Sequence, residues 1–525
     1  MSSLSNIIPF IISNVKVNNY WTNLTTLLFL PKQTKIKNFF LLLGYYYVIR
    51  NSSKYLTNKI YRSLKVCKPV RNMIQKETSK IILDIKKDLH QEVKTLTNYH
   101  RLPGKGVTKE FIISEFEKMK ELYTFDYQKG RVSGAIYNNN EELDKLLLQT
   151  YPYFMKSNSL HTNVFPAIRK MENDIVKMMI HLFQGNDSAC GTFTSGGTES
   201  ILLACKTYRD KYQLTNPNII VSSTAHCAFK KACQYFKIEY LEIPCLPNGL
   251  FDTKILQNTI NKNTILVVAS APSYNLGLID PIEQIAKITT KYDIGLHVDC
   301  CMGAFLINFM NQFGGFKTKG VTSISADIHK YGNSPKGAST ILYHNKELLQ
   351  YQYFIDEEWS GGVYATSTIA GSKSGNIVAL TWITLLYNGM EFYQKTYQTI
   401  MSLREYFIQK LYQIDKLYVY GEPELNIIAI GSKHINMNIL GEELKKKKWN
   451  INMIQKPGGF HFCLTSYHNK EIIDTFFNDM IDLIKTVPSS KSKSKCIYGT
   501  MESINDNEIV KDVIVDYLHL INAVI

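Results

Sequence analysis

The stretch Ser323–Ser339 contains a lysine, Lys330, that directly follows a histidine at the exit of an apolar, strand-like run. An amine bonds covalently to an aldehyde only when it is neutral part of the time. Burial at the end of a strand and a nearby cation are expected to lower the pKa of this lysine. A His-Lys pair by itself is more often a solvated turn, but here it predicts a lysine that holds an aldehyde cofactor.

A carboxylate, Asp299, ends the β-rich run 294–299 and lies 31 residues before Lys330. This spacing accommodates one strand, one connection and the next strand. Because α/β sheets bind ligands at the carboxyl ends of their strands, Asp299 and Lys330 are expected to face one pocket from neighbouring strands. An acid that keeps a pyridine nitrogen protonated and an amine that carries the aldehyde are the pair that such chemistry needs.

Small residues precede a helical pattern at 194–200, which reads Thr-Ser-Gly-Gly-Thr-Glu-Ser. Such residues let the backbone approach an anion, and the free amides at the helix start then bind it. The stretch has neither the Walker lysine nor the dinucleotide glycine spacing. We therefore predict a phosphate cup that consists of Ser195, Gly196, Gly197 and Thr198.

A histidine, His226, follows the β-like run 218–222 and is expected to stack on a flat ring.

Phosphate cup, ring histidine, ring aspartate and lysine follow one another in this order along the chain. In these features the sequence resembles the group II decarboxylase branch of the fold-type I pyridoxal-phosphate enzymes, and within that branch the lyases of phosphorylated sphingoid bases. The resemblance runs from about Ser133 to Met501 and into the N-terminal segment. Its most specific stretches are 133–137, 194–210, 297–299, 323–337 and 368–372.

The resemblance implies pyridoxal 5'-phosphate as cofactor and a retro-aldol cleavage of long-chain base phosphates to a fatty aldehyde and phosphoethanolamine. It implies a homodimer, because the family builds its sites from both subunits. Tyr274 matches a second family tyrosine loosely. The implied catalytic residues are Lys330, Asp299, Tyr137 and His226, and the implied cofactor ligands are Lys330, Asp299, His226, Ser195, Gly196, Gly197, Thr198 and His329. The implied ligands of the substrate phosphate are Asn158, His161 and Lys336, and no metal is implied.

Three stretches depart from the family pattern. The chain reads Asp-Cys-Cys-Met-Gly-Ala-Phe from Asp299, where the family usually has Asp-Ala-Cys-Leu-Gly-Gly-Phe. Residues 364–373 lack the family's proline and end in lysine rather than arginine, in a loop that reaches the neighbouring subunit's site in this family. Ser159 replaces a proline. None of these changes removes a chemical group from the implied site.

Strand-like runs alternate with helical ones, which predicts an α/β fold with a mainly parallel sheet and helices on both faces. The resemblance implies that this fold has the fold-type I arrangement. We expect an N-terminal membrane anchor and connector at 1–105, a large cofactor-binding domain at 106–390 and a smaller α+β domain at 391–525. The expected strands are 218–222, 237–243, 264–270, 294–299, 321–326 and 339–343, and the expected helices after the sheet are 376–388 and 391–414.

The net charge of +15 is concentrated at one end of the chain of 525 residues. Residues 1–105 contain 18 Lys/Arg and 4 Asp/Glu, a net charge of +14, so the body has no basic stripe for nucleic acid. The ten cysteines lack metal-ligand spacing and favour a reducing compartment.

The most apolar runs, 24–30 and 39–49, precede the basic segment 50–71. The run 39–49 is shorter than the roughly 20 residues that span a bilayer, so hydropathy alone also allows an interfacial or buried helix. Its tyrosines suit a membrane interface and the basic segment suits a cytoplasmic flank. Together with the resemblance, these features predict a single-pass anchor in the endoplasmic reticulum membrane, with the catalytic body in the cytosol.

Two other functions are compatible with parts of this pattern. One is a pyridoxal-phosphate-dependent decarboxylase of glutamate or an aromatic amino acid, which needs no subsite for a substrate phosphate. The other is a catalytically silent membrane scaffold, against which Asp299, Lys330 and the phosphate cup argue.

Overall fold

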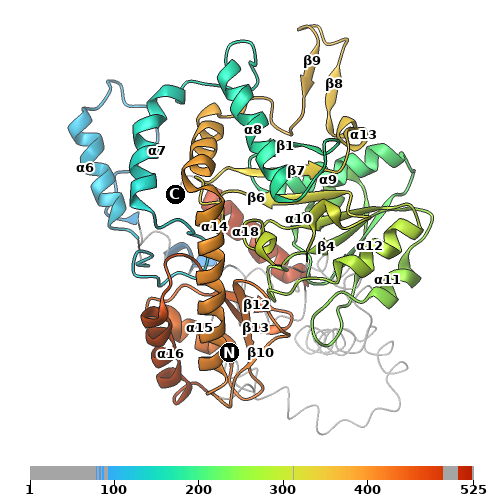
Figure 1. The fold of residues 1–525 in the computed structure, drawn as a ribbon. Helices are drawn as coiled ribbons and strands as arrows, with labels where there is room; N and C mark the ends of the chain where they lie inside the picture. Colours follow the sequence, from blue (N-terminus) through green and yellow to red (C-terminus); the bar gives the residue numbers. More distant parts are fainter. Residues whose placement is uncertain are drawn as a thin grey trace, which may run out of the picture. The chain divides into compact units, whose positions relative to one another are not determined.

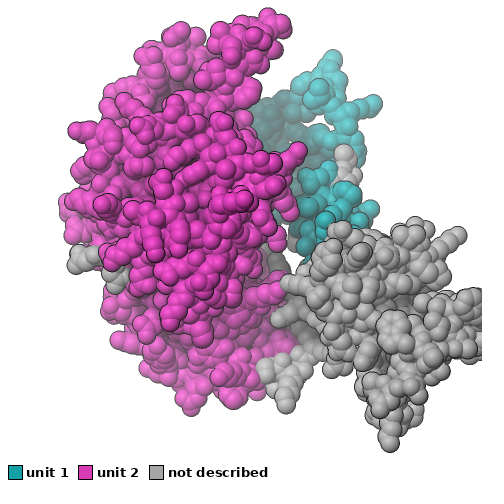
Figure 2. Space-filling view, turned by 90° about the vertical axis from the view of Figure 1, so that its right-hand side faces the viewer, with its two compact units in different colours: residues 1–122, 497–525 teal, residues 123–496 magenta. Residues whose placement is uncertain are grey.

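The computed structural model describes residues 79, 82–83, 85–87, 93–123, 125–310, 313–488 and 507–522. Its chain forms two compact units, residues 1–122 with 497–525, and residues 123–496 (Figure 2). The predicted apolar runs 24–30 and 39–49 and the basic segment after them lie outside the described residues. Within the part that is described, no helix is both long and apolar enough to cross a membrane.

In the first unit the structure describes helices α6 (Lys109–Lys120) and α18 (Asn507–Asn522). The Thr108 side chain caps α6 by accepting a hydrogen bond from the amide of Phe111. The remaining elements belong to the second unit, which contains every predicted site residue.

A seven-stranded sheet is the centre of the second unit (Figure 1). Its strand order is β1-β7-β6-β5-β4-β2-β3. The strands β3, β2, β4, β5 and β6 run parallel to one another, whereas β7 is antiparallel to both β6 and β1. The prediction of a mainly parallel sheet is confirmed. The strands are β1 (Cys190–Thr194), β2 (Asn218–Ser222), β3 (Glu239–Ile243), β4 (Thr264–Ser270), β5 (Gly295–Asp299), β6 (Ser323–Asp327) and β7 (Ser339–Tyr343).

The sheet is covered on both faces because successive side chains of a strand point to opposite sides. In β2, Ile219 and Val221 pack in one hydrophobic cluster, which includes side chains of α9 and α10, while Ile220 packs in the other, which includes side chains of α8 and α12. Such burial on both faces explains why these strands read as continuous apolar runs. The helices around the sheet are α7 (Glu141–Phe154), α8 (Pro166–Leu182), α9 (Gly197–Tyr212), α10 (Ala228–Phe236), α11 (Thr253–Thr259), α12 (Ile282–Lys291) and α13 (Lys346–Leu349).

A second, antiparallel sheet has the order β10-β11-β13-β12 and packs with α15 (Met437–Lys446) and α16 (Lys470–Ile484). Helix α14 (Gly375–Leu411) leads to it and has a kink at Gly389, whose φ is 63°. A hairpin of β8 (Phe354–Asp356) and β9 (Tyr364–Thr366) extends away from the large sheet (Figure 1). The strands of the second sheet are β10 (Tyr418–Val419), β11 (Ile427–Gly431), β12 (Asn452–Gln455) and β13 (Gly458–Cys463).

The structure reproduces β2, β4 and β7 at their predicted bounds and shifts the other predicted strands by one or two residues. It adds β1, which the sequence analysis missed. The two helices predicted at 376–388 and 391–414 form the single element α14, with the kink at Gly389 between them. A glycine at this positive φ bends the helix without the steric cost that other residues have.

Candidate active site

Asp299 and Lys330 follow neighbouring strands, as predicted. β5 and β6 are parallel, and Asp299, the last residue of β5, pairs in register with Ser325 of β6. β6 ends at Asp327, and Lys330 comes three residues later. The carboxyl ends of the two strands therefore bring the carboxylate and the lysine to the same edge of the sheet.

Buried hydroxyl groups orient Asp299. Its Oδ1 accepts hydrogen bonds from Ser325 Oγ at 3.0 Å and from the amide of Cys301 at 3.1 Å. On the other side of Ser325, its Oγ lies 3.1 Å from Nε2 of His297, whose Nδ1 lies 2.9 Å from Ser323 Oγ. Burial lowers the pKa of His297 to about 4, against the opposing effect of Asp299. The neutral imidazole and the two serines thus fix the orientation of the Asp299 carboxylate.

The immediate partner of Lys330 is a carboxylate that the sequence analysis gave no role. Lys330 Nζ lies 2.9 Å from Asp327 Oδ2, and the Asp327 side chain is 3% exposed. Burial alone would lower the pKa of Lys330 and raise that of Asp327, but their mutual attraction outweighs it, so the lysine pKa is raised and the aspartate pKa lowered. The expected lowering of the Lys330 pKa is therefore wrong for the cofactor-free chain, because a carboxylate rather than a cation lies beside the amine.

His329 contributes to the same pair. Its Nε2 lies 3.4 Å from Asp327 Oδ2, and its Nδ1 accepts a hydrogen bond from the amide of Ala338 at 3.1 Å. Because Nδ1 is an acceptor, Nε2 carries the proton and faces the carboxylate. His329 therefore helps to fix Asp327 next to Lys330.

Tyr137 and Lys336 lie together near this ion pair. Lys336 Nζ is 4.6 Å from the centroid of the Tyr137 ring and donates to the carbonyl of His329 at 3.2 Å. Tyr137 is 7% exposed, and its ring packs edge-on against Tyr331 with centroids 5.0 Å apart. Burial raises the pKa of Tyr137, so its hydroxyl keeps its proton. Burial, and then the charge of Lys330, lower the pKa of Lys336 to about 8.

The predicted cup lies between β1 and the start of α9. A Cβ added to Gly197 would lie 2.7 Å from Cys301 Sγ and 2.9 Å from Asp327 Oδ1, and one added to Gly196 would lie 3.5 Å from His329 Cε1. The glycine pair thus borders the Lys330–Asp327 pair, and a side chain at Gly197 would collide with Cys301 and Asp327. Ser195 donates both its amide and its Oγ to Glu199 Oε2, each at 2.7 Å, and Thr198 is exposed in the first turn of α9.

This arrangement fits pyridoxal phosphate. The glycine cup at a helix start suits the phosphate, Lys330 suits the aldehyde and Asp299 suits the ring nitrogen. Asp327 borders both the cup and the lysine, and Cys301, which lies beside Gly197 of the cup, donates its amide to Asp299.

His226 lies beside Tyr274. The two rings pack edge-on with centroids 6.4 Å apart, and Tyr274 packs edge-on against the buried His461 of β13 at 4.8 Å. His226 Nδ1 accepts a hydrogen bond from the amide of Ala228 at 3.2 Å, which fixes the orientation of its ring. Tyr274 also affects the pKa of Tyr137, so it belongs to the same neighbourhood.

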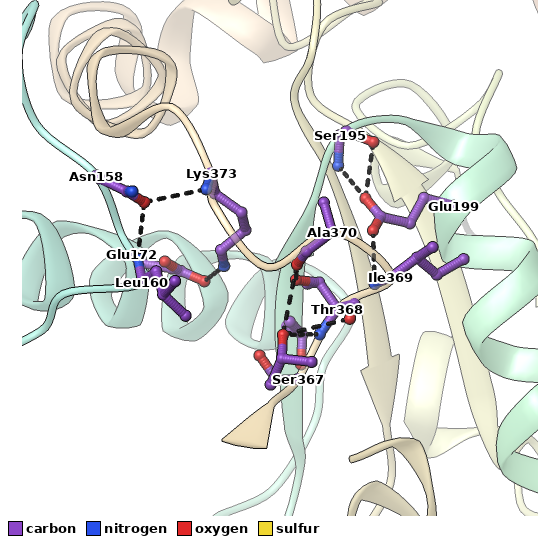
Figure 3. Close-up of polar contacts among 12 residues, drawn as sticks. Asn158, Leu160, Glu172, Ser195, Glu199, Ser367, Thr368, Ile369, Ala370 and Lys373 are labelled. Atoms are coloured by element: carbon purple, nitrogen blue, oxygen red, sulfur yellow. Dashed lines mark hydrogen bonds and ion pairs between the residues drawn. The ribbon is translucent and has the colours of Figure 1, made fainter. Parts of the chain in front are cut away.

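Asn158 and His161 occupy the turn after α7. Asn158 Oδ1 accepts hydrogen bonds from the amides of Leu160 at 3.1 Å and Lys373 at 3.2 Å, and Asn158 Nδ2 donates to Ser372 Oγ at 3.1 Å (Figure 3). His161 is exposed. The amide of His161 donates to the carbonyl of Asn158 at 3.2 Å, whereas Lys336 donates to the carbonyl of His329.

Sequence reasoning missed several residues that shape the site. Asp327 carried a signal, because it lies three residues before Lys330 at a strand end. Glu199 lies four residues after Ser195 in the first turn of a helix, where a carboxylate satisfies amides. Nothing local indicated that Asn426 Nδ2 donates to Tyr331 OH at 2.7 Å and contacts Cys463 Sγ at 3.4 Å, since these residues are far apart in the sequence.

Comparisons with known proteins identify the family of the chain. Residues 135–432 match the pyridoxal-dependent decarboxylase conserved domain. Sphingosine-1-phosphate lyase 1 of Rattus norvegicus is 36% identical over 474 residues, which cover 87% of this chain and 83% of the rat protein. Sphingosine-1-phosphate lyase of Drosophila melanogaster is 36% identical over 490 residues, which cover 90% of each protein.

Two solved structures agree in fold. The sphingosine-1-phosphate lyase of Burkholderia pseudomallei is 28% identical and aligns with a TM-score of 0.75 over 82% of this chain and 98% of that one. Glutamate decarboxylase of Lactobacillus brevis is 16% identical and aligns with a TM-score of 0.66 over 76% of this chain and 97% of that one, which indicates a common fold alone. The match over most of its length to curated relatives, together with the pyridoxal-dependent domain, shows that the chain is a pyridoxal-phosphate-dependent lyase that belongs to the sphingosine-1-phosphate lyase family.

Proposed function

We propose that this protein cleaves phosphorylated long-chain bases to a fatty aldehyde and phosphoethanolamine, as the names of its relatives indicate for sphingosine 1-phosphate. The single structural observation that carries this proposal is the second lysine: Lys336 Nζ lies over the Tyr137 ring and beside the segment that holds Lys330. A decarboxylase of an aromatic amino acid needs no such additional cation, whereas a lyase that acts on a phosphate ester does.

Pyridoxal phosphate, when bound, supplies a sink for the electron pair that is released at the substrate's α-carbon. Lys330 would hold the cofactor through its aldehyde carbon, and Asp299 would keep a proton at the ring nitrogen. Ser325 and the amide of Cys301 hold the Asp299 carboxylate in one orientation. His226 would cover the ring, and the glycine cup would bind the cofactor phosphate.

Tyr137 acts on the substrate oxygen as a hydrogen-bond donor. Because burial raises its pKa, the phenol is protonated at neutral pH and is suited to orient the β-hydroxyl group. Lys336 binds the substrate phosphate as a point charge, and its Nζ lies over the Tyr137 ring, next to the group that orients the hydroxyl. Asn158 and His161 complete the phosphate subsite.

The test is a parallel incubation of the purified holoenzyme with a sphingoid-base phosphate, glutamate and an aromatic amino acid. We expect fatty aldehyde and phosphoethanolamine from the first substrate and no carbon dioxide from the other two. Lys330→Ala serves as the control that lacks the cofactor-binding amine. Carbon dioxide release from an amino acid, without aldehyde from the phosphate ester, would assign the protein to the decarboxylases.

A homodimer is the proposed assembly. The β8–β9 hairpin and the residues around it expose large apolar side chains, Phe354, Ile355, Trp359, Val363 and Ile369. Exposed apolar side chains that gather in this way are typical of protein–protein contacts. Sedimentation equilibrium is expected to give twice the chain mass, and Trp359→Glu is expected to shift the protein towards the monomer.

The membrane attachment is proposed from the sequence. The apolar run 39–49 with its following basic segment supports a single anchor in the endoplasmic reticulum membrane, with the catalytic unit in the cytosol. Residues 106–390 and 391–525 remain the proposed large and small domains. Protease protection in microsomes, read with antibodies to each end of the chain, tests the orientation.

A further inference from the structure

Glu199 connects two segments that are 170 residues apart. Its Oε2 accepts the amide and the hydroxyl group of Ser195 in the cup, and its Oε1 accepts the amide of Ile369 at 3.0 Å (Figure 3). Ile369 belongs to the loop 367–374, which joins β9 to α14. One carboxylate therefore fastens this loop to the cofactor cup.

The other end of the loop is fastened to the segment 157–160. The Asn158 side chain bonds to Ser372 Oγ and to the amide of Lys373, and the amide of Ser159 donates to the carbonyl of Lys373 at 3.0 Å. Lys373 Nζ also pairs with Glu172 Oε1 of α8 at 2.6 Å. This end therefore lies on the segment that is proposed to bind the substrate phosphate.

Further hydrogen bonds hold the first residues of the loop. Thr368 Oγ1 donates to the carbonyl of Ala370 at 2.8 Å, and the amide of Thr368 donates to Thr366 Oγ1 at 3.2 Å. The buried Gln352 donates to the carbonyl of Ser367 at 2.6 Å. The contacts of Ile369 with Glu199 and of Ser372 with Asn158 lie only three residues apart in the loop, so a displacement at one of them reaches the other.

We propose that Glu199 is a positioning residue that couples the cofactor cup to the substrate-phosphate segment through the loop 367–374. The chemistry of the contact explains the residue type, because only a carboxylate offers two acceptor oxygens to donors on opposite sides. A glutamine there would turn an NH₂ group towards one of the donors. The substrate half of the coupling rests on the proposed function, whereas the fastening of the loop does not.

A simpler role for Glu199 is to satisfy the start of α9, since it lies in the first turn of that helix. The two roles separate in Glu199→Asp. This variant keeps the negative charge at the helix start, but its side chain is one methylene shorter and does not bridge from Ser195 to Ile369. Glu283→Gln is the matched control, because Glu283 is an exposed acidic residue in the first turn of α12.

The first measurement is hydrogen exchange of the purified holoenzyme, which requires no substrate. In Glu199→Gln and Glu199→Asp, we expect the amides of 366–375 and 157–160 to exchange about tenfold faster. This factor is the effect expected from the loss of one charge-assisted hydrogen bond. Glu283→Gln is expected to leave both segments unchanged. Faster exchange confined to 195–212, or restored by Glu199→Asp, would mean that Glu199 only satisfies the helix start and would overturn the proposal.

The second measurement is steady-state kinetics with a sphingoid-base phosphate at saturating cofactor. We expect KM to rise about tenfold in both Glu199 variants while kcat changes less than about twofold. In the double variant with Asn158→Ala, the rise is expected to be smaller than the product of the two single effects, since both residues hold one loop. Multiplicative effects on KM would contradict the coupling. If no variant cleaves the ester, the proposed function fails, and the exchange result still decides whether Glu199 holds the loop.

Discussion

The lowered pKa of Lys336 predicts a pH dependence of substrate capture. Burial, and then the charge of Lys330, lower this pKa to about 8, so the amine loses its proton as the pH rises through that value. Since the cationic form of Lys336 binds the phosphate, the affinity for the substrate is highest below about pH 8 and decreases above it. The side chain as a whole is exposed, so water screens part of the effect and the midpoint is expected at about 8 or slightly higher.

The size of the effect follows from the titration. kcat/KM reports ionisations of the free enzyme, so it is expected to fall about tenfold for each pH unit above the midpoint. The kcat/KM of the wild type stops falling when it reaches the kcat/KM of Lys336→Ala, because that variant lacks the lysine charge at every pH. A charge-assisted hydrogen bond contributes roughly 1.5–3 kcal/mol, so that level is about tenfold to a hundredfold below the wild-type plateau.

The assay is kcat/KM for a sphingoid-base phosphate between about pH 6.5 and pH 9.5, with cofactor absorbance recorded alongside. Lys336→Arg is the informative variant, because a guanidinium stays charged up to about pH 12 and should remove the alkaline fall. Lys319→Ala, at an exposed lysine, should reproduce the wild-type profile. A wild-type profile without an alkaline fall, or the same fall in Lys336→Arg, would refute the role of Lys336.

Four further outcomes are expected. Asp299→Asn should reduce turnover by about 10²–10⁴-fold with the cofactor still bound, because an amide does not keep the ring nitrogen protonated; full activity would reject this role. Asp327→Asn should lower the pKa of Lys330 in the cofactor-free protein, seen as acylation of Lys330 at lower pH; an unchanged reactivity profile would show that Asp327 does not set this pKa. Phe407→Ala should cost about 3–5 kcal/mol of unfolding free energy in a denaturant titration, since it removes a fully buried ring that packs against Phe462, Phe476 and Phe477; a loss below about 1 kcal/mol would contradict that packing. Removal of residues 1 to about 70 should release a folded catalytic unit from membranes, and complete retention in the membrane fraction would require another attachment.

The sequence was sufficient for the parts of the site that depend on strand ends. Asp299 and Lys330 follow consecutive apolar runs, and parallel strands bring their carboxyl ends to one edge of the sheet, so their placement on neighbouring strands could be predicted. β1 was missed because its Cys-Gly-Thr-Phe-Thr run is short and its pairing with β7 joins residues about 150 positions apart. Such a pairing leaves no local periodicity.

The electrostatics of Lys330 could not be predicted in the same way. The sequence shows two carboxylates near the lysine, Asp299 and Asp327, but only the turn after β6 determines that Asp327 is the ion-pair partner. Likewise, Glu199 could be recognised as a helix-start residue, but not as a contact of Ile369, because that contact depends on how the loop after β9 returns to the cup.

The central claim is that Lys330, rather than the nearby Lys336, holds pyridoxal phosphate. The most direct test is to reduce the purified holoenzyme with borohydride, digest it and locate the pyridoxyl group by peptide mass spectrometry. We expect one label per chain, on Lys330, with none on Lys336. A label on Lys336, or a label on another lysine when Lys330 is intact, would contradict it.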